Sequence, residues 1–127
     1  MTCKILIADD EPNILISLEY LMKRAGYEVH LARDGQEALD VLRRERPRLV
    51  LLDVMMPKKT GFEVCQELRG DDAVKDTLVL MLTAKGRDTD VAKGMAMGAD
   101  AYMTKPFSTQ ELVQKVRDML AAPAPDR

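Results

Sequence analysis

The sequence is poor in the residues on which many metal and nucleophilic centres depend. Its 127 residues include one histidine, two cysteines and no tryptophan. Zinc sites and cysteine–histidine nucleophiles require such side chains in clusters, so we expect neither kind of centre. Cys3 and Cys65 lie far apart in the sequence. The simplest expectation for them is two buried free thiols in a reducing compartment.

Long apolar runs and a strong net charge are also lacking. No segment reaches the roughly 18 consecutive apolar residues that cross a bilayer, and the first residues lack the pattern of a signal peptide. The net charge of −2 gives no electrostatic footprint for nucleic acid. We therefore expect a cytoplasmic protein that binds neither membrane nor nucleic acid. The basic residues Arg43, Arg44 and Arg46 are expected on the exposed face of a helix.

Short apolar runs alternate with segments of helical periodicity along the whole chain. The runs are at residues 3–8, 27–32, 49–52, 78–82 and 101–104. Residues typical of helix starts stand before or at the beginning of four helical segments: Pro12, Asp34, Thr60 and Ser108. Strands that alternate with amphipathic helices form a parallel sheet covered on both faces. The sequence predicts one α/β domain at residues 1–120 and a proline- and alanine-rich tail or linker stub at residues 121–127.

The fourth helical segment, residues 88–98, is the least regular of the five. It contains Gly94 and Gly98, and each glycine inside a helix costs about 1 kcal/mol relative to alanine. We expect this helix to be the softest, although the glycines are equally well explained by close packing. Met95 and Met97 are suited to adaptable packing or to a partner surface, and one of them is expected to fill the core.

Polar side chains follow four of the five strands: Asp9, Asp10, Asp53, Thr83 and Lys105. Each of them alone has an ordinary explanation, such as a helix cap or a surface lysine. Because the carboxyl ends of parallel strands meet at one edge of the sheet, we expect all five to share a small cleft. Their joint occurrence makes the ordinary explanations inadequate.

Three neighbouring carboxylates in this cleft repel one another, and a hard divalent cation such as Mg²⁺ relieves the repulsion. Asp53 is then a candidate nucleophile that forms an acyl-phosphate. Lys105 and the metal would neutralise the charge on the transferred group, and Thr83 would donate a hydrogen bond to a phosphoryl oxygen. The chain has no glycine-rich phosphate-binding loop, so a nucleotide bound at this cleft is not the expected phosphoryl source.

The sequence resembles the receiver domain of two-component response regulators over residues 3–120. The resemblance rests on four segments: ILIADDEP at 5–12, LVLLDVMMPKKTGFE at 49–63, LMLTAKG at 80–86 and GADAYMTKPF at 98–107. The intervals also fit, because Thr83 lies 30 positions after Asp53 and Lys105 lies 22 positions after Thr83. The resemblance implies a flavodoxin-like, doubly wound sheet of five parallel strands in the order 2-1-3-4-5, with five helices.

The resemblance also implies a phosphorylation-activated signalling switch rather than an enzyme, one that assists its own phosphotransfer and dephosphorylation. Asp53 would accept a phosphoryl group from a sensor histidine kinase or a phosphotransfer protein. Lys105 would contact that group, and its bond to the next residue, a proline, would be cis. Mg²⁺ would be held by Asp10, by Asp53, by Asp9 through water, and by the backbone carbonyl of Met55.

On phosphorylation, the resemblance implies that Thr83 moves toward the phosphate and Tyr102 turns inward. The output surface would be the fourth helix, the fifth strand and the fifth helix. Its expected charges are Lys93, Asp100, Glu111, Lys115 and Asp118. Opposite charges on one face permit a symmetric dimer. Val91 stands where the transcription-factor subgroup often has a basic residue, which puts the usual dimer contacts in doubt.

Two alternatives compete with this interpretation. A haloacid dehalogenase-type phosphatase also uses an aspartate nucleophile, but it needs a second aspartate two residues later, where this chain has Met55. A phosphorylation-independent interaction module would be expected to have lost an acid or the lysine, and none is lost. Because Met55 cannot orient an attacking water, we expect slow to moderate loss of the phosphoryl group. Lys85 is expected near the phosphate.

Overall fold

The computed structural model describes residues 3–84 and 88–121. Strands and helices alternate through these residues in the order β1 (Lys4–Ala8), α1 (Pro12–Arg24), β2 (Glu28–Ala32), α2 (Gly35–Glu45), β3 (Leu49–Asp53), α3 (Gly61–Arg69), β4 (Leu78–Ala84), α4 (Asp88–Ala96), β5 (Ala101–Lys105) and α5 (Thr109–Ala121). The strands form one parallel sheet in the order β2-β1-β3-β4-β5. The predicted flavodoxin-like topology is therefore confirmed.

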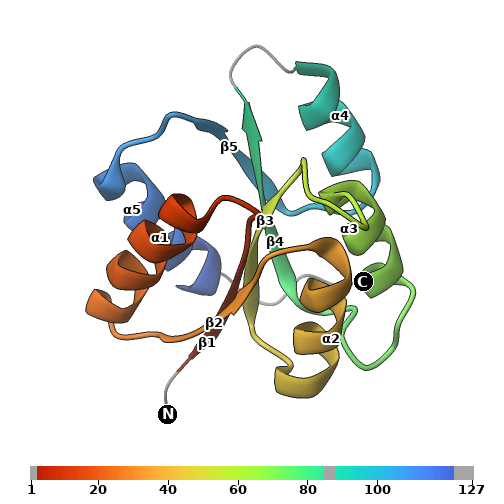
Figure 1. The fold of residues 1–127 in the computed structure, drawn as a ribbon, viewed down its shortest axis with the longest axis horizontal. Coiled ribbons are helices and arrows are strands. Elements are labelled where there is room, and N and C mark those ends of the chain that lie inside the picture. The colour runs from red at the N-terminus through yellow and green to blue at the C-terminus, as the bar shows by residue number, and fades with distance from the viewer. Residues whose placement is uncertain (1–2, 85–87, 122–127) are drawn as a thin grey trace.

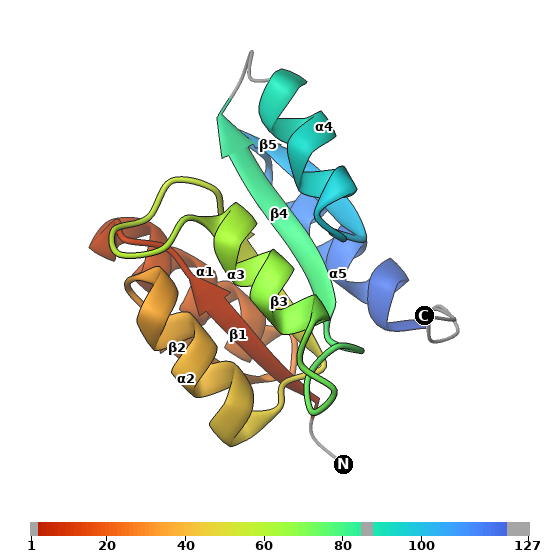
Figure 2. The same ribbon diagram turned by 90° about the vertical axis from the view of Figure 1, so that its right-hand side faces the viewer.

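The sheet lies between two layers of helices. Figure 1 shows α1 and α5 on one side of the sheet, and in Figure 2 helices α2, α3 and α4 lie in front of it. Side chains of the central strand β3 alternate between the two sides, since Leu49 and Leu51 pack in the α1/α5 core and Val50 and Leu52 in the other. All four are fully buried. The continuous apolar run at residues 49–52 is thus explained by a strand that is covered on both faces.

The helices begin where their capping residues predict. The Asp34 side chain accepts a hydrogen bond from the Glu37 backbone N–H at 2.8 Å, and Ser108 Oγ accepts one from Glu111 at 3.0 Å. Thr60 and Glu63 form a reciprocal capping box at the start of α3. Each cap satisfies an N–H group that has no partner within its own helix.

The ends of several elements differ from the predictions. Strand β4 continues to Ala84, two residues beyond the predicted end, and β5 includes Lys105. Helix α4 ends at Ala96, so Gly98 lies outside it with φ +108°. A side chain at Gly98 would also collide with Arg69. The predicted position of Gly98 inside the helix was therefore wrong, because this glycine makes the turn that follows α4.

The structure corrects the prediction for one cysteine and shows what surrounds Gly94, Met95 and Met97. Cys65 is buried, but Cys3 is half-buried, because it precedes the strand that would cover it. A Cβ at Gly94 would lie 3.4–3.7 Å from side-chain atoms of Met81 and Phe62, which is ordinary van der Waals contact, so these neighbours leave room for an alanine. Met97 packs against the core while Met95 is exposed, as expected for one of the pair.

Some predictions concern residues outside the described ranges. Ala121 still belongs to α5, whereas the rest of the predicted tail, residues 122–127, lies outside the described residues, as does Lys85. Within residues 3–84 and 88–121, the structure holds no helix with the length and apolar character needed to cross a membrane.

Arg69, at the end of α3, joins three segments that are distant in the sequence. Its guanidinium donates to the carbonyl oxygens of Gly98, Lys75 and Thr77 at 2.9, 2.7 and 2.6 Å, and to Asp100 Oδ2 at 2.8 Å. The same Asp100 oxygen accepts from the Val79 backbone N–H at 2.8 Å. Asp100 was expected on the output surface. It lines a groove there with Tyr102 and Lys115, and its carboxylate also pairs with Arg69.

Replacing Arg69 with methionine tests this connection. We expect Arg69→Met to lower the free energy of unfolding by about 2–4 kcal/mol, because it removes the ion pair with Asp100 and the hydrogen bonds to three part-buried carbonyl groups. Arg43→Met is the matched control, since Arg43 pairs with Asp71 on the exposed surface and such pairs contribute about 0–1 kcal/mol. Urea denaturation followed by circular dichroism measures both. Equal effects of the two substitutions would contradict the role of Arg69.

Candidate functional site

The candidate site lies at the carboxyl edge of the sheet, where four strand ends meet. Asp9 follows β1, Asp53 ends β3 and Lys105 ends β5. The register pairs Ala8 with Leu52, so Asp9 and Asp53 extend from neighbouring strands one position further on. Lys105 pairs with Ala84 at the end of β4, and that small residue lines the same cavity as the acids. The topology therefore brings acids and lysine together, as predicted.

The Lys105 ammonium group bridges the two buried acids. Its Nζ lies 3.0 Å from Asp9 Oδ2 and 3.3 Å from Asp53 Oδ1. The second oxygen of Asp9, Oδ1, accepts a hydrogen bond from the Glu11 backbone N–H at 3.0 Å. Asp9 is almost fully buried, with 1% of its surface exposed. These contacts fix the position of the buried carboxylates and compensate part of their charge.

Asp10 completes a group of three carboxylates. One oxygen from each of Asp9, Asp10 and Asp53 lies within 4.8 Å of the others. Asp10 is exposed, whereas Asp9 and Asp53 are buried, so the group opens toward solvent at one side. A set of carboxylate oxygens with an open side is the donor set that a hard divalent cation such as Mg²⁺ requires.

The environment changes the ionisation of Asp53 and Lys105 in different ways. Burial, followed by the charge of Asp9, raises the pKa of Asp53 to about 6, although Lys105 acts against the increase. Burial alone would lower the pKa of Lys105, but the hydrogen bond to Asp9 and the charge of Asp53 outweigh it and raise that pKa. Lys105 therefore stays cationic, while the ionised form of Asp53 is disfavoured by its surroundings.

The loop after β3 is shaped by close backbone approach. Any side chain at Gly61 would collide with the backbone carbonyl of Asp53, and the Gly61 N–H donates to the Val54 carbonyl at 2.9 Å. This contact folds the loop back against the end of β3. The side chain of Met55 is 60% exposed and lines the cavity beside Asp53. The Lys105–Pro106 peptide bond is cis, as the resemblance implies.

Thr83 and Tyr102 lie at the expected positions but outside the cavity. Thr83 is buried, and its hydroxyl donates to the Met103 carbonyl at 3.5 Å, a long hydrogen bond. It is not among the described residues that line the cavity around Asp53. Tyr102 is 47% exposed on β5. The structure thus brings together Asp9, Asp10, Asp53 and Lys105, and leaves the threonine side chain beside β5.

Asp90 is a cavity residue that sequence reasoning missed. The cavity around Asp53 has a volume of about 310 Å³ and is lined by Asp9, Asp10, Glu11, Asp53, Val54, Met55, Ala84, Asp90 and Lys105. Asp90 comes from the first turn of α4 and is only 9% exposed. An acid in the first turn of a helix is common for electrostatic reasons. The one available signal was its phase, which places it on the same face as Gly94, four residues later.

A second group of possible metal ligands lies at the opposite end of the sheet. Glu28, His30 and Glu45 have donor atoms within 4.8 Å of one another. The Lys4 ammonium lies 3.3 Å from Glu45 and 4.0 Å from Glu28. A lysine thus already supplies positive charge to these acids. Sequence reasoning expected no metal cluster with histidine, and this group is the nearest approach to one among the described residues.

Comparisons with known proteins agree with this arrangement. The family model of the response regulator receiver domain matches residues 5–117. The chain is 47% identical over 120 residues to the alkaline phosphatase synthesis transcriptional regulatory protein PhoP of Bacillus subtilis (strain 168). That alignment covers 94% of this chain and 49% of the relative, so the chain spans about half of the relative's length.

Two solved structures are similar over nearly the whole chain. One is the chemotaxis response regulator CheY4 of Vibrio cholerae, with a TM-score of 0.87 and 34% identity, covering 93% of this chain and 98% of that one. The other is the receiver domain of the sensor histidine kinase PA1611 of Pseudomonas aeruginosa PAO1, with a TM-score of 0.88 and 25% identity, covering 96% and 100%. The second structure has a magnesium ion coordinated in its active-site cleft.

The raised pKa of Asp53 predicts a specific pH dependence of stability. Because the folded-state pKa of about 6 lies above the ordinary value of 3.8, the folded protein binds this proton more tightly, and stability falls as pH rises from about 4 to 6. In buffer without divalent cations, Asp53→Asn should therefore be more stable than the wild type at pH 7.5, by about 1–3 kcal/mol.

The difference should vanish near pH 3.5, where Asp53 is largely protonated in both states. Asp72→Asn is the control, because Asp72 is exposed and such substitutions change stability by about 0.5 kcal/mol or less. Urea denaturation across this pH range measures the difference. If Asp53→Asn gained the same stability at pH 3.5 and 7.5, ionisation of Asp53 would not be the cause of the gain.

Proposed function

Because the chain belongs to the response regulator receiver domain family of two-component signalling, we propose that it is a phosphorylation-activated switch with Asp53 as its phosphoacceptor. The observation that carries the proposal is the placement of Lys105 Nζ, 3.3 Å from Asp53 and 3.0 Å from Asp9. A structural salt bridge would need one acid. The second buried acid and the exposed Asp10 are expected in a site that must also bind a cation and a phosphoryl group.

The proposed metal ligands are Asp10 and Asp53, with Asp9 acting through water and the backbone carbonyl of Met55 completing the set. The fit rests on the carboxylate oxygens of Asp9, Asp10 and Asp53, which lie within 4.8 Å of one another. Mg²⁺, when bound, would supply positive charge that offsets the repulsion among these acids and the phosphoryl oxygens.

Asp53 would act as the nucleophile of phosphotransfer. One carboxylate oxygen forms a bond to phosphorus as the bond from phosphorus to the donor, a phosphohistidine nitrogen of a sensor kinase or phosphotransfer protein, breaks. Lys105 holds the carboxylate by its hydrogen bond and faces the same space as the incoming phosphoryl oxygens. Its raised pKa keeps it cationic throughout.

Thr83 and Tyr102 are the proposed switch residues. The Thr83 hydroxyl has only a long hydrogen bond, 3.5 Å, to the Met103 carbonyl, so turning toward a phosphoryl oxygen would sacrifice little. The phosphoryl group adds about −1.5 to −2 charge and three strong acceptors. Tyr102, exposed on the neighbouring strand, would then turn inward into the space that the threonine leaves.

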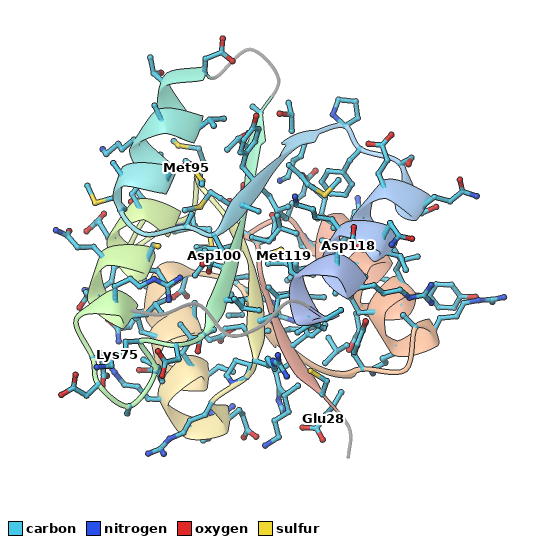
Figure 3. All side chains as sticks on the ribbon, turned by 180° about the vertical axis from the view of Figure 1, so that it is seen from behind. Glu28, Lys75, Met95, Asp100, Asp118 and Met119 are labelled. Atoms are coloured by element: carbon cyan, nitrogen blue, oxygen red, sulfur yellow. The ribbon has the colours of Figure 1, made fainter. Side chains whose placement is uncertain are left out.

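The proposed output surface is formed by α4, β5 and α5. This surface would bind a partner protein or a second copy of the chain. A shallow groove on this surface is lined by Met95, Tyr102, Glu111 and Lys115 among others, and Figure 3 shows Met95 on α4 and Asp118 on α5 at this side. The glutamate and lysine allow self-complementary pairs. Lys93 was expected on the same surface, but its ammonium lies over the Phe62 ring, 4.7 Å from the centroid, on the side toward α3.

Phosphorylation by a small donor tests the proposal directly. Incubation with acetyl phosphate and Mg²⁺ should add the mass of one phosphoryl group to the intact protein, and peptide analysis should place it on Asp53. EDTA and Asp53→Asn should each abolish the addition. Asp40→Asn, which removes an exposed acid on α2, should leave it unchanged. A protein that hydrolyses the donor repeatedly without retaining the group would instead be a phosphatase, and absence of any transfer would refute the proposal.

Met55 predicts how long the phosphoryl group persists. Its exposed apolar side chain lines the cavity beside Asp53 and cannot orient an attacking water by hydrogen bonding. We expect the wild type to keep its phosphoryl group for minutes or longer, and Met55→Asn to shorten that lifetime severalfold. Loss of the added mass after removal of the donor measures it. Met95→Asn, at an exposed position on α4, should have no effect. A wild-type lifetime of seconds would contradict the role of Met55.

A further inference from the structure

The loop between β3 and α3, residues 54–60, carries one of the proposed metal ligands, the backbone carbonyl of Met55. The two ends of this loop are joined, because the Gly61 N–H donates to the Val54 carbonyl at 2.9 Å. Gly61 also lies directly against the backbone of Asp53. Since both ends are fixed to the sheet in this way, the position of the Met55 carbonyl depends on what holds the middle of the loop.

The middle of the β3–α3 loop rests on Gly35, the first residue of α2, and the loop passes beside the start of this helix in Figure 2. The Gly35 N–H donates to the Pro57 carbonyl at 3.2 Å, and the same carbonyl accepts from the Lys59 N–H at 2.7 Å. A Cβ at Gly35 would collide with the Lys59 carbonyl oxygen and would lie 2.5 Å from the Lys59 Cβ. Two segments that are distant in the sequence thus meet backbone to backbone, which requires a residue without a side chain.

A side chain at Gly35 would displace the loop rather than the helix. Pro57 and Lys58 are exposed, and the Lys58 ammonium lies 3.6 Å from Asp34 in an ion pair at the surface, which holds the loop only weakly. The helix cannot retreat in the same way without opening the core. Four apolar side chains of α2 are buried there: Ala38, Leu39, Val41 and Leu42.

We propose that Gly35 is a positioning residue of the metal site, because its lack of a side chain lets the β3–α3 loop lie where the Met55 carbonyl can reach the cation. The inference rests on the proposed function, in which Met55 is one of the Mg²⁺ ligands. Mg²⁺ demands nearly ideal octahedral geometry, so displacement of one carbonyl weakens its binding. Groups that orient a ligand without touching the metal typically change metal affinity by about 10–100-fold.

Titration of the metal-free protein with MgCl₂, followed by nitrogen-15 nuclear magnetic resonance, tests this role. We expect Gly35→Ala to raise the Kd for Mg²⁺ by about tenfold. Val41→Ala is the matched control, because it destabilises the same helix by removing buried methyl groups but lies nearly two turns further from the loop. Its Kd should stay within about twofold of the wild type. Equal Kd values for Gly35→Ala and Val41→Ala would overturn the inference.

The rate of phosphoryl transfer from acetyl phosphate separates positioning from general damage to the site. Asp53 and Lys105 come from the ends of β3 and β5, whereas Gly35 acts on the loop. At saturating Mg²⁺ the Gly35→Ala protein should therefore reach a rate within about twofold of the wild type, with the half-saturating Mg²⁺ concentration raised about tenfold. A rate that stays low at saturating Mg²⁺ would count against a role confined to the metal ligand.

The wild type provides a further test that does not depend on the folding of Gly35→Ala. Because linkage is reciprocal, Mg²⁺ that fixes the loop also strengthens the contact of Gly35 with the Pro57 carbonyl. Mg²⁺ should slow hydrogen exchange of the Gly35 amide severalfold and leave that of Ala38, which donates to the Asp34 carbonyl, unchanged. Mg²⁺ binding without any change at Gly35 would overturn the inference. A wild type that binds no Mg²⁺ would instead refute the proposed metal site.

Discussion

The contact on which the rest of the structure depends is that of one ammonium group with two buried carboxylates. Lys105 lies 3.0 Å from Asp9 and 3.3 Å from Asp53, and these three residues come from the ends of three different strands. The strand order makes this possible, because β3 lies between β1 and β4 and only β4 separates it from β5. The lysine side chain crosses the end of β4, where Ala84 is small enough to leave space. The compensation is incomplete, since burial and Asp9 still raise the pKa of Asp53 to about 6.

Incomplete compensation gives the site its proposed chemistry. A fully neutralised cluster would be a structural salt bridge with nothing left to attract a cation. In this cleft the surplus of negative charge favours a divalent cation, and the cation in turn favours a phosphoryl group. The helices around the site differ in how they are held. Helices α1, α2, α3 and α5 bury apolar side chains, whereas the buried residues of α4 are Asp90 and Gly94.

Much of this arrangement could be predicted from local sequence patterns. The alternation of apolar runs and helical periodicity gave the element order, and the parallel sheet that follows from it placed Asp9, Asp10, Asp53 and Lys105 at one edge. Caps such as Asp34 and Thr60 were predictable because each acts within a few residues of its own helix. The buried Leu49–Asp53 strand was also predictable, because a continuous apolar run has no polar face to expose to solvent.

The features that escaped prediction depend on contacts between distant residues. Asp100 lines the groove at the output surface, as expected, but its ion pair with Arg69, 31 positions away, was not predicted. Gly98 was predicted inside a helix, because the sequence does not show where the turn after α4 begins. In the structure this turn gives Gly98 its left-handed backbone. The role of Asp90 in the cavity was not recognisable, because an acid in the first turn of a helix is usually explained by the helix dipole. The direction of the Thr83 hydroxyl depends on a neighbouring strand that sequence alone does not position in detail.

Carbon-13 nuclear magnetic resonance of the Asp53 side-chain carboxyl, titrated with acid in the absence and presence of Mg²⁺, tests the central claim most directly. We expect the metal-free protein to titrate this group near pH 6 and saturating Mg²⁺ to lower its pKa, because the cation favours the charged form. A carboxyl that titrates near its ordinary value of 3.8 in both conditions would contradict the claim, since the carboxylates in the cleft would then not be under mutual repulsion.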